Sequence, residues 1–437
     1  MSKNKKGLKE RKRERQMKQQ RSAEAQQKRR EAKPKKNSRH LSKKKLFLAI
    51  SLIVIILGVI LVWQFSIKHF MTIYIRSDGT VDPSTATISN LDNSHYTFTA
   101  DIFGSIVIER DNIVIDGTNH ILHGEIDTNS TGIELSGRSN VTITNLRIKD
   151  FEYGIFLKSG TNIVLSKNDL TNEYSIGFDS CLNNTVIENN ITNSYGAILL
   201  AQSSNNTIIK NNLDNNTYGL NLDYGSTTNT ISGNIITNSE GAIFLTKLSN
   251  NNSFSENNLE KNKQGITLDQ SLDNSIVGNT ITDCEGAIGL TYSSNNQITE
   301  NNIIDNQYSI SITSNSESNS ISENDIKSSD LAIGFIYSSN NQITENNIVD
   351  NEFGVYLNSS SDNSFFRNSF LNNTNQAFSL DSFNAWDNEN LSGGNFWSDY
   401  EERYPDAEKL DQSRIWNTPY TIDENNKDNY PLVNRET

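Results

Sequence analysis

The sequence has few of the residues that stabilise small or strongly apolar domains. It contains only two cysteines among 437 residues, Cys181 and Cys284, and its hydrophobic content is 34%. The two cysteines lie about five units of an internal repeat apart, which separates them by more than about 20 Å if each unit advances by one strand spacing. This separation excludes a disulfide between them. The modest apolar content, beside frequent asparagine and serine, argues against a conventional large core.

The chain also lacks a helical pattern in its long central part. No apolar stripe recurs there at the 3.6-residue period, and Asn, Ser, Thr and Ile are poor helix formers. Instead, short alternating stretches lie between turn residues, which is typical of strands. A unit of about 22 residues repeats. One position of the unit holds asparagine ten times in succession: Asn168, Asn189, Asn211, Asn234, Asn257, Asn279, Asn301, Asn324, Asn346 and Asn368.

Each unit predicts one coil of three short strands that stacks on the next coil at about 4.8 Å. Alternating apolar pairs such as Ile198/Leu200 and Ile288/Leu290 then form continuous interior columns. We expect the asparagine column to be a structural ladder, whose residues adopt the left-handed turn conformation and whose amides hydrogen-bond along the stack. Recurring glycines before the apolar pairs predict a second tight turn; they are Gly132, Gly154, Gly196, Gly219, Gly241, Gly265, Gly286 and Gly354.

The predicted fold class is all-β, a single-stranded right-handed parallel β-helix with caps at both ends, because parallel crossovers turn right-handed. A leucine-rich horseshoe has a similar period. It needs leucine at most apolar positions and a helical return segment, whereas the return segments here contain Asn, Ser and Thr.

Charge divides the chain sharply. Residues 1–45 hold 20 Lys/Arg and 4 Asp/Glu, a net charge of +16. The rest of the chain holds 19 Lys/Arg and 48 Asp/Glu, a net charge of −29. The uncharged run 46–67 is long enough to span a bilayer, and the preceding lysines place the N-terminus in the cytoplasm. A cleaved signal peptide would have a shorter basic region and a small-residue cleavage site. We therefore expect a single-pass membrane anchor with an extracellular C-terminal region.

These patterns predict five segments. They are a basic cytoplasmic head (1–45), a transmembrane helix (46–67), an N-terminal cap with the first coils (72–130), β-helix repeats (131–383) and a C-terminal capping segment (384–437) that contains three of the four tryptophans. The basic head is expected to lie near anionic lipid headgroups. Nucleic-acid binding by this head is the alternative that we do not favour.

The two ends carry a family resemblance. The start, IYIRSDGTVDP followed by IVIERDNIVIDGTNHILHG, and the tail, GGNFWSDYEERYPD followed by WNTPYTIDENNKDNYPLV, resemble NosD-type, carbohydrate-associated parallel β-helix repeat proteins that are common on archaeal cell surfaces. The resemblance covers about residues 72–433. It implies the fold and an extracytoplasmic location but names no reaction, and WNTPY departs from the usual acidic residue before TPY.

Two side-chain columns are candidate binding sites. Tyr153, Tyr174, Tyr195 and Tyr218 lie on four consecutive coils, each directly before a recurring glycine except Tyr174, which precedes Ser175. An aromatic column is either a platform for sugar rings or a self-stacked structural ladder. Glu300, Glu323 and Glu345 occupy one position on successive coils. They predict either a solvated acidic surface or a Ca²⁺ site, because a cation would offset their repulsion.

No catalytic residues are assigned. The Asn-Thr-Asp, Asp-Asp and Gly-His-Gly signatures of sugar-hydrolase β-helices do not occur in the sequence. Asp179, Asp223 and Asp269 recur on alternate coils, which is compatible with an inverting carboxylate pair, but no His or Arg column accompanies them. A copper site needs His, Met and Cys, and His120 and His123 alone form a weak one.

Three classes of function remain, in this order. The first is a non-catalytic surface module that binds polysaccharide or a cell-envelope ligand, or serves a structural role. The second is a polysaccharide lyase or hydrolase with an unrecognised site, and the third is a NosD-like copper accessory protein. No cofactor is required, with Ca²⁺ as the open alternative. N-glycosylation sequons occur at Asn129, Asn140, Asn183, Asn190, Asn205, Asn215, Asn251, Asn358, Asn372 and Asn390, so an external glycoprotein is expected.

Overall fold

The computed structural model describes residues 17–18, 70–125, 129–388, 393–410 and 414–435. The chain divides into two units, Met1–Lys68 and His69–Thr437. The predicted basic head, apart from Met17 and Lys18, and the predicted membrane helix lie outside the described residues. Within the part of the chain that is described, no helix has the length and apolar character needed to cross a bilayer.

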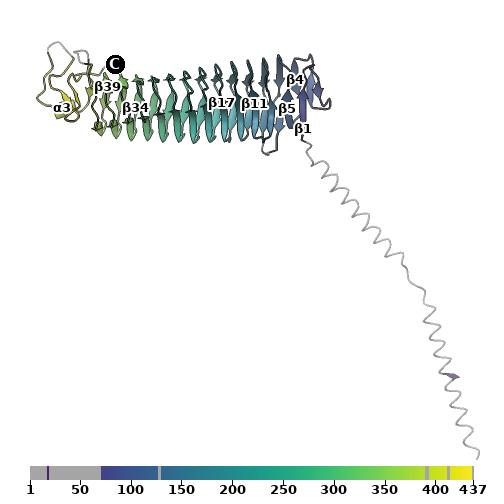
Figure 1. Cartoon of the computed structure of the whole chain (residues 1–437). Helices are drawn as coiled ribbons and strands as arrows, with labels where there is room; N and C mark the ends of the chain where they lie inside the picture. Colours follow the sequence, from purple (N-terminus) through teal and green to yellow (C-terminus); the bar gives the residue numbers. More distant parts are fainter. Residues whose placement is uncertain (1–16, 19–69, 126–128, 389–392, 411–413, 436–437) are drawn as a thin grey trace, which may run out of the picture. The chain divides into compact units, whose positions relative to one another are not determined.

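The second unit is a stack of about 13 coils, each with three strands (Figure 1). The strands of successive coils pair in parallel and form three sheets. Sheet A contains β1 (Met71–Ile75), β5 (Ile102–Ile108), β8 (Thr131–Glu134), β11 (Tyr153–Lys158), β14 (Tyr174–Asp179), β17 (Gly196–Ala201), β20 (Tyr218–Asp223), β23 (Gly241–Leu245), β26 (Gln264–Asp269), β29 (Gly286–Thr291), β32 (Tyr308–Thr313), β35 (Leu331–Ile336), β38 (Phe353–Asn358) and β41 (Asn375–Leu380).

The other two sheets consist mainly of three-residue strands. Sheet B contains β3 (Ile88–Asn90), β4 (His95–Phe98), β6 (Ile113–Asp116), β9 (Val141–Thr144), β12 (Val164–Ser166), β15 (Thr185–Ile187), β18 (Thr207–Ile209), β21 (Thr230–Ser232), β24 (Ser253–Ser255), β27 (Ser275–Val277), β30 (Gln297–Thr299), β33 (Ser320–Ser322), β36 (Gln342–Thr344) and β39 (Ser364–Phe366). Sheet C contains β7 (Ile121–His123), β10 (Arg147–Lys149), β13 (Asp169–Thr171), β16 (Asn190–Thr192), β19 (Asn212–Asp214), β22 (Ile235–Thr237), β25 (Asn258–Glu260), β28 (Thr280–Thr282), β31 (Asn302–Ile304), β34 (Asp325–Lys327), β37 (Asn347–Val349), β40 (Ser369–Leu371) and β42 (Phe396–Trp397).

The register stacks equivalent side chains as the repeat predicts. Ile176 pairs with Ile198, which pairs with Leu220, and all three side chains are fully buried. Apolar columns of this kind fill the interior of the coils, where a column of identical or similar side chains packs without voids. The predicted right-handed parallel β-helix is confirmed.

The asparagine column lies at the corner between sheets B and C, and its side chains are buried. Asn189 is 2% exposed. Its Nδ2 donates to the Leu165 carbonyl at 2.9 Å and to Asn211 Oδ1 at 3.0 Å, while its Oδ1 accepts from the backbone nitrogen and Nδ2 of Asn168. Each amide thus satisfies backbone groups that the turn leaves unpaired inside the stack.

The left-handed residue in this turn is the one before each asparagine. Glu188, Lys210 and Glu256 have φ angles of 56°, 55° and 55°, whereas the buried asparagines do not have positive φ. Our expectation that the asparagine itself takes the left-handed conformation was therefore wrong. The amide is needed at the buried position, and the residue that bends the chain is exposed.

The recurring glycines do not form a second tight turn, contrary to expectation. Gly154, Gly219 and Gly265 lie within strands of sheet A. A Cβ atom at Gly219 would come within 2.6 Å of the Ala242 carbonyl oxygen of the next coil, so close stacking of the coils excludes large side chains there. Gly241 lies in a different, outward-facing column and pairs with Tyr218 and Gln264.

Two further ladders line the other corners. Between sheets A and B, each asparagine donates its Nδ2 to the Oδ1 of the next from Asn184 to Asn384, as in the step from Asn206 to Asn229 at 3.1 Å. Between sheets C and A the position alternates among Asn, Ser and Cys, and Cys284 there has its backbone nitrogen bonded to Asn306 Oδ1. Of these asparagine-containing ladders, only the one at the B–C corner was predicted from the sequence.

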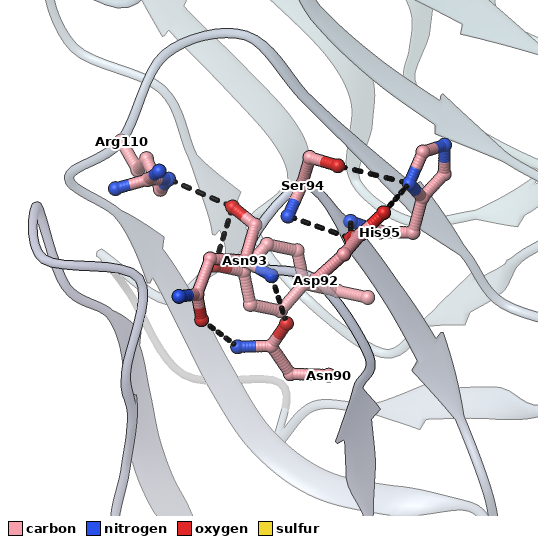
Figure 2. Close-up of polar contacts among 7 residues, drawn as sticks. Asn90, Asp92, Asn93, Ser94, His95 and Arg110 are labelled. Atoms are coloured by element: carbon pink, nitrogen blue, oxygen red, sulfur yellow. Dashed lines mark hydrogen bonds and ion pairs between the residues drawn. The ribbon is translucent and has the colours of Figure 1, made fainter.

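An antiparallel hairpin, β3 and β4, covers the N-terminal end. Its turn is held by polar contacts (Figure 2): Asn90 and Asn93 exchange two hydrogen bonds of 2.8 Å, and Asp92 Oδ1 accepts from the backbone nitrogens of Ser94 and His95. Arg110 Nε donates to the Asn93 carbonyl at 2.9 Å. Because β3 pairs with β4 alone, it is the edge strand of sheet B at this end.

The C-terminal segment extends the interior columns with aromatic rings. Trp397 stacks on Phe370 and on Tyr420, with ring centroids 4.4 and 4.0 Å apart. Asn395 continues the B–C ladder beyond Asn368, at 3.0 Å. The cap also contains the short helix α3 (Tyr400–Arg403) and the hairpin of β43 (Tyr420–Thr421) with β44 (Lys427–Asp428).

A buried carboxylate ties the two parts of this cap together. Asp428 accepts hydrogen bonds from the backbone nitrogens of Asn395 and Tyr430 and from Trp397 Nε1, at 2.7, 3.0 and 2.9 Å. Burial raises the pKa of this carboxyl to about 7, although the three donors oppose the shift. The GGNFW and KDNYPL segments are thus joined around one side chain.

At the opposite end of the stack, β2 (Val81–Asp82) pairs with β1 in an antiparallel pair.

Candidate functional site

The outward face of sheet A has a continuous row of aromatic rings. We call Tyr153, Phe156, Tyr174, Tyr195, Tyr218 and Phe244 the aromatic strip. Successive ring centroids along it lie between 5.1 and 5.6 Å apart. Five of the rings are half-buried, and Tyr195 is 50% exposed. The structure thus brings together the four tyrosines that the sequence singled out and adds two phenylalanines.

Tyr195 joins this strip from a neighbouring register position. Tyr174 pairs with Gly196, which pairs with Tyr218, so Tyr195 is one residue out of the predicted column. The missing side chain at Gly196 leaves room for the rings, because a Cβ atom there would lie 3.1 Å from Tyr174 Cδ1. Phe244 similarly occupies the space over Gly241, where a Cβ atom would overlap its ring.

The rings of the strip differ in orientation. Tyr153 and Tyr174 are stacked at 22°, so each covers a face of the other. Tyr195 is perpendicular to both of its neighbours, at 87° and 84°. Burial raises the pKa of the Tyr153 and Tyr174 hydroxyls, which keeps them neutral. The strip therefore combines a self-stacked end with a half-exposed ring at Tyr195.

Three more exposed tyrosines follow strands of sheet A and were not predicted from the sequence. Tyr224, Tyr292 and Tyr337, which we call the tyrosine row, occupy the same turn position after β20, β29 and β35, and they are 57%, 56% and 60% exposed. Their φ angles are 51°, 49° and 52°. Bulky side chains are uncommon in this left-handed region, because they are strained there.

Other coils place serine, glutamine or lysine at this turn position, as at Ser180, Gln202 and Lys247. An exposed, strained tyrosine gains nothing from burial, so its presence on three coils points to a role at the surface. Lys247 Nζ lies 3.8 Å from the centre of the Tyr224 ring. The only sequence signal was the short pattern of Tyr followed by Gly or Ser and then Ser, directly after a strand.

Carboxylates flank the aromatic residues. The sheet A strands from β11 to β38, together with the residue before each strand and the turn residue after it, contain nine Asp/Glu and three Lys in total. The net charge of this set is −6. Strands β9 to β39 of sheet B mostly expose serine and threonine, and with the same flanking residues they hold five Glu, two Lys and one Arg, a net charge of −2. Sheet A is thus the acidic and aromatic face, and sheet B the hydroxyl face.

The three aspartates of the possible carboxylate pair lie along one column of sheet A, as the spacing predicts. Asp179 pairs with Ala201, which pairs with Asp223, and Asp269 follows two coils later. Lys158 lies 3.4 Å from Asp179, and Lys247 lies 3.3 Å from Asp223.

The predicted glutamate column lies at the B–C corner, away from the aromatic residues of sheet A. Glu300, Glu323 and Glu345 are exposed and have φ angles of 57°, 56° and 60°. Glu345 Oε1 accepts from Arg367 Nη1 at 3.3 Å. Glu323, Glu345 and Arg367 line a hollow of about 550 Å³ together with Arg435.

The soft metal ligands are dispersed over the described residues. Burial raises the pKa of the Cys181 and Cys284 thiols to about 11, so both remain protonated and are poor metal ligands. His120 lies 3.4 Å from Asp101, and the His123 ring stacks on Phe103. Across the described ranges, no group of three or more His, Cys, Asp or Glu is arranged around a metal position.

The stacked coils and the ladders define a parallel β-helix, and the family follows from it. The model of the right handed beta helix region matches residues 72–236, 131–281 and 197–333, more than half of the chain. The chain belongs to this family. Residues 303–402 also match the model of the periplasmic copper-binding protein NosD, which supports the NosD-type resemblance. This segment contains no His, Cys or Met, so its residues do not fit a copper site.

Solved structures share the fold at low sequence identity. A mutant of the periplasmic alginate epimerase AlgG is 14% identical, with a TM-score of 0.52; the alignment covers 71% of this chain and 83% of that chain. The A-module of the Azotobacter vinelandii mannuronan C-5 epimerase AlgE6 is 12% identical, with a TM-score of 0.49; the alignment covers 67% of this chain and 88% of that chain. No curated protein matches the chain.

Proposed function

We propose that this chain is a membrane-anchored, extracytoplasmic surface module that binds polysaccharide without transforming it. The uncharged run 46–67 supplies the anchor, and the excess of basic residues before it orients the β-helix outward. The binding surface is the outward face of sheet A, with Tyr195 of the aromatic strip and the tyrosine row as contact residues. The β-helix displays this face as a rigid rod.

The tyrosine row is the observation that supports binding most directly. Three exposed tyrosines stand at strained turn positions of the same kind, and nothing in the interior of the rod requires them. Apolar faces of sugar rings stack on aromatic side chains, and stacked contacts between aromatic side chains are worth about 0.5–1.5 kcal/mol each. A rigid row of such contacts binds an extended glycan with little loss of protein conformational entropy.

A glycan-binding measurement with the full-length protein tests this function. The double variant Tyr292→Asn/Tyr337→Asn should bind polysaccharide about tenfold more weakly, because two stacking contacts are lost. Asparagine suits the left-handed turn, so the fold is retained. The matched control is Ile235→Asn on sheet C, where the paired residues Asn212 and Asn258 are already asparagine. Equal affinity of the double variant and the control would refute the proposed binding face.

The main alternative is a polysaccharide lyase or hydrolase that uses the aspartate column. The structural relatives named as alginate epimerases act on a polysaccharide, although at 12–14% identity they support the fold alone. The same preparation decides between the two functions. Binding without release of reducing ends or unsaturated sugars supports the module, and release that is lost in Asp223→Asn supports the enzyme.

A further inference from the structure

We infer that the sheet A face selects glycans that carry amino groups and rejects polyuronates. This inference rests on the proposed function and adds the class of its ligand. It follows from the charges that accompany the aromatic rings. An aromatic ring beside a carboxylate attracts an ammonium group twice, through the negative face of the π-system and through the ion pair.

Carboxylates border the rings on both sides. Glu152 and Glu173 directly precede Tyr153 and Tyr174, and Glu285 precedes Gly286 at the start of β29. On the other side, Asp179, Asp223 and Asp269 end their strands. Sheet A with its flanking residues thus holds a net charge of −6, against −2 for the strands of sheet B counted in the same way.

The lysines of this face do not cancel this charge. Lys158, Lys247 and Lys263 each lie within 3.7 Å of a carboxylate of the same face, at Asp179, Asp223 and Glu240. Glu173, Asp269 and Glu285 have no cationic partner among the described residues. These three carboxylates remain available for a cationic ligand. A uronic acid polymer would instead meet uncompensated repulsion along the whole face.

The spacing of the face fits an extended amino sugar chain. A β-1,4-linked chain of pyranose rings advances by about one coil spacing per ring, so one ring can lie over each coil of about 4.8 Å. Amino groups on the same side of such a chain recur at every second ring. The aspartates recur on every second coil, about 9–10 Å apart. Lys158 and Lys247 pair with Asp179 and Asp223, so Asp269 is, among the described residues, the member of this column that is free to bind an ammonium group.

Three hexasaccharides of matched length test the inference with the full-length protein: glucosamine, N-acetylglucosamine and mannuronate oligomers linked β-1,4, in mildly acidic buffer. We expect the glucosamine oligomer to bind about fivefold to tenfold more tightly than the acetylated one, because its ammonium groups form exposed ion pairs with the free carboxylates and the acetylated groups do not. Any binding of the mannuronate oligomer should be equally strong in the native protein and in the tyrosine variants. The tyrosine variants are needed for this condition because the basic head, with its charge of +16, would attract any polyanion by charge alone.

The triple variant Glu173→Gln/Asp269→Asn/Glu285→Gln should lose the preference for glucosamine and keep its affinity for the acetylated oligomer. The control Glu256→Gln/Glu300→Gln/Glu323→Gln removes the same charge from the B–C corner and should retain the preference. Equal affinity for the charged and acetylated oligomers, or tighter tyrosine-dependent binding of mannuronate, would overturn the inference and leave the proposed function intact. Failure of all three oligomers to bind through the tyrosines would overturn both.

Discussion

The interior of the coil stack and the outward face of sheet A follow different rules. Inside, each position repeats: an asparagine column continues through every central coil, and isoleucine and leucine fill the apolar columns. Outside, sheet A changes from coil to coil among tyrosine, glycine, glutamate and lysine. The coil geometry therefore fixes the interior and leaves the surface free. Substitutions inside should change stability alone, and substitutions on sheet A should change binding alone.

The largest expected effect tests the interior at its C-terminal end. Trp397→Ala should destabilise the last coils by about 3–5 kcal/mol, because a fully buried ring stacked between Phe370 and Tyr420 is lost. Hydrogen exchange of β40 and β41 would report the loss. The exposed Phe383→Ser should stay within about 0.5 kcal/mol. If hydrogen exchange of these strands were unchanged in Trp397→Ala, the cap would not contribute to the stability of the last interior coils.

The buried carboxylate of the cap gives the interior a pH dependence. The folded-state pKa of Asp428, about 7, lies above the unfolded value of about 3.9. The folded protein therefore binds this proton more readily, and the resulting stability is complete below about pH 4 and is lost as the pH rises through about 7. The change amounts to at most about 4 kcal/mol. Urea unfolding of the native protein and of Asp428→Asn across this range should differ in slope; parallel curves would contradict the assignment.

A ladder substitution probes the central interior. Asn301→Leu should cost about 3 kcal/mol, because it leaves the Ile276 carbonyl and the Asn279 donors unpaired inside the stack. Thermal unfolding followed by circular dichroism measures the loss. The neighbouring Asn295→Ser is exposed and left-handed, and serine already occupies the equivalent position at Ser318, so it should be nearly neutral. Glycan affinity should not change in either variant.

The smallest expected effect is a gain in stability. It tests most directly whether the interior and the sheet A face follow different rules. Tyr337→Asn should stabilise the protein by about 0.5–1 kcal/mol, because asparagine tolerates the left-handed conformation better than tyrosine. The same variant should bind glycan more weakly. A stability gain with a loss of affinity would show that the strained tyrosine is retained for the surface, and a destabilised variant would show that its ring contributes to folding.

Much of the interior could be predicted from the sequence because identical side chains recur at identical positions. The period, the apolar columns and the Asn168 to Asn368 column all follow from this recurrence. The left-handed positions were missed because asparagine occurs at both the exposed turn and the buried ladder, as in the adjacent pair Asn205 and Asn206. Local sequence does not distinguish an amide that bends the chain from one that is buried.

The surface was harder to predict because it lacks this recurrence. Tyr195 was placed in the strip by counting from Gly196, but the buried isoleucines set the register and shift it by one residue. The tyrosine row has members three and two coils apart, so no regular period revealed it. The two phenylalanines of the strip belong to a column that also holds Gly177 and Asn221, and only the ring contacts identify them.

The asparagine ladders have a consequence for the length of the rod. Each internal coil presents the same donors and acceptors to the coil before it and the coil after it, and Asn395 and Asn426 of the C-terminal segment meet the last coil with these same amides. If one internal coil is inserted or deleted, the coils on either side of the change still present matching donors and acceptors to each other. Duplication of a segment of 22 or 23 residues would thus lengthen the molecule by one step of about 4.8 Å, and the length of the proposed binding face becomes a property that evolution can change by whole units.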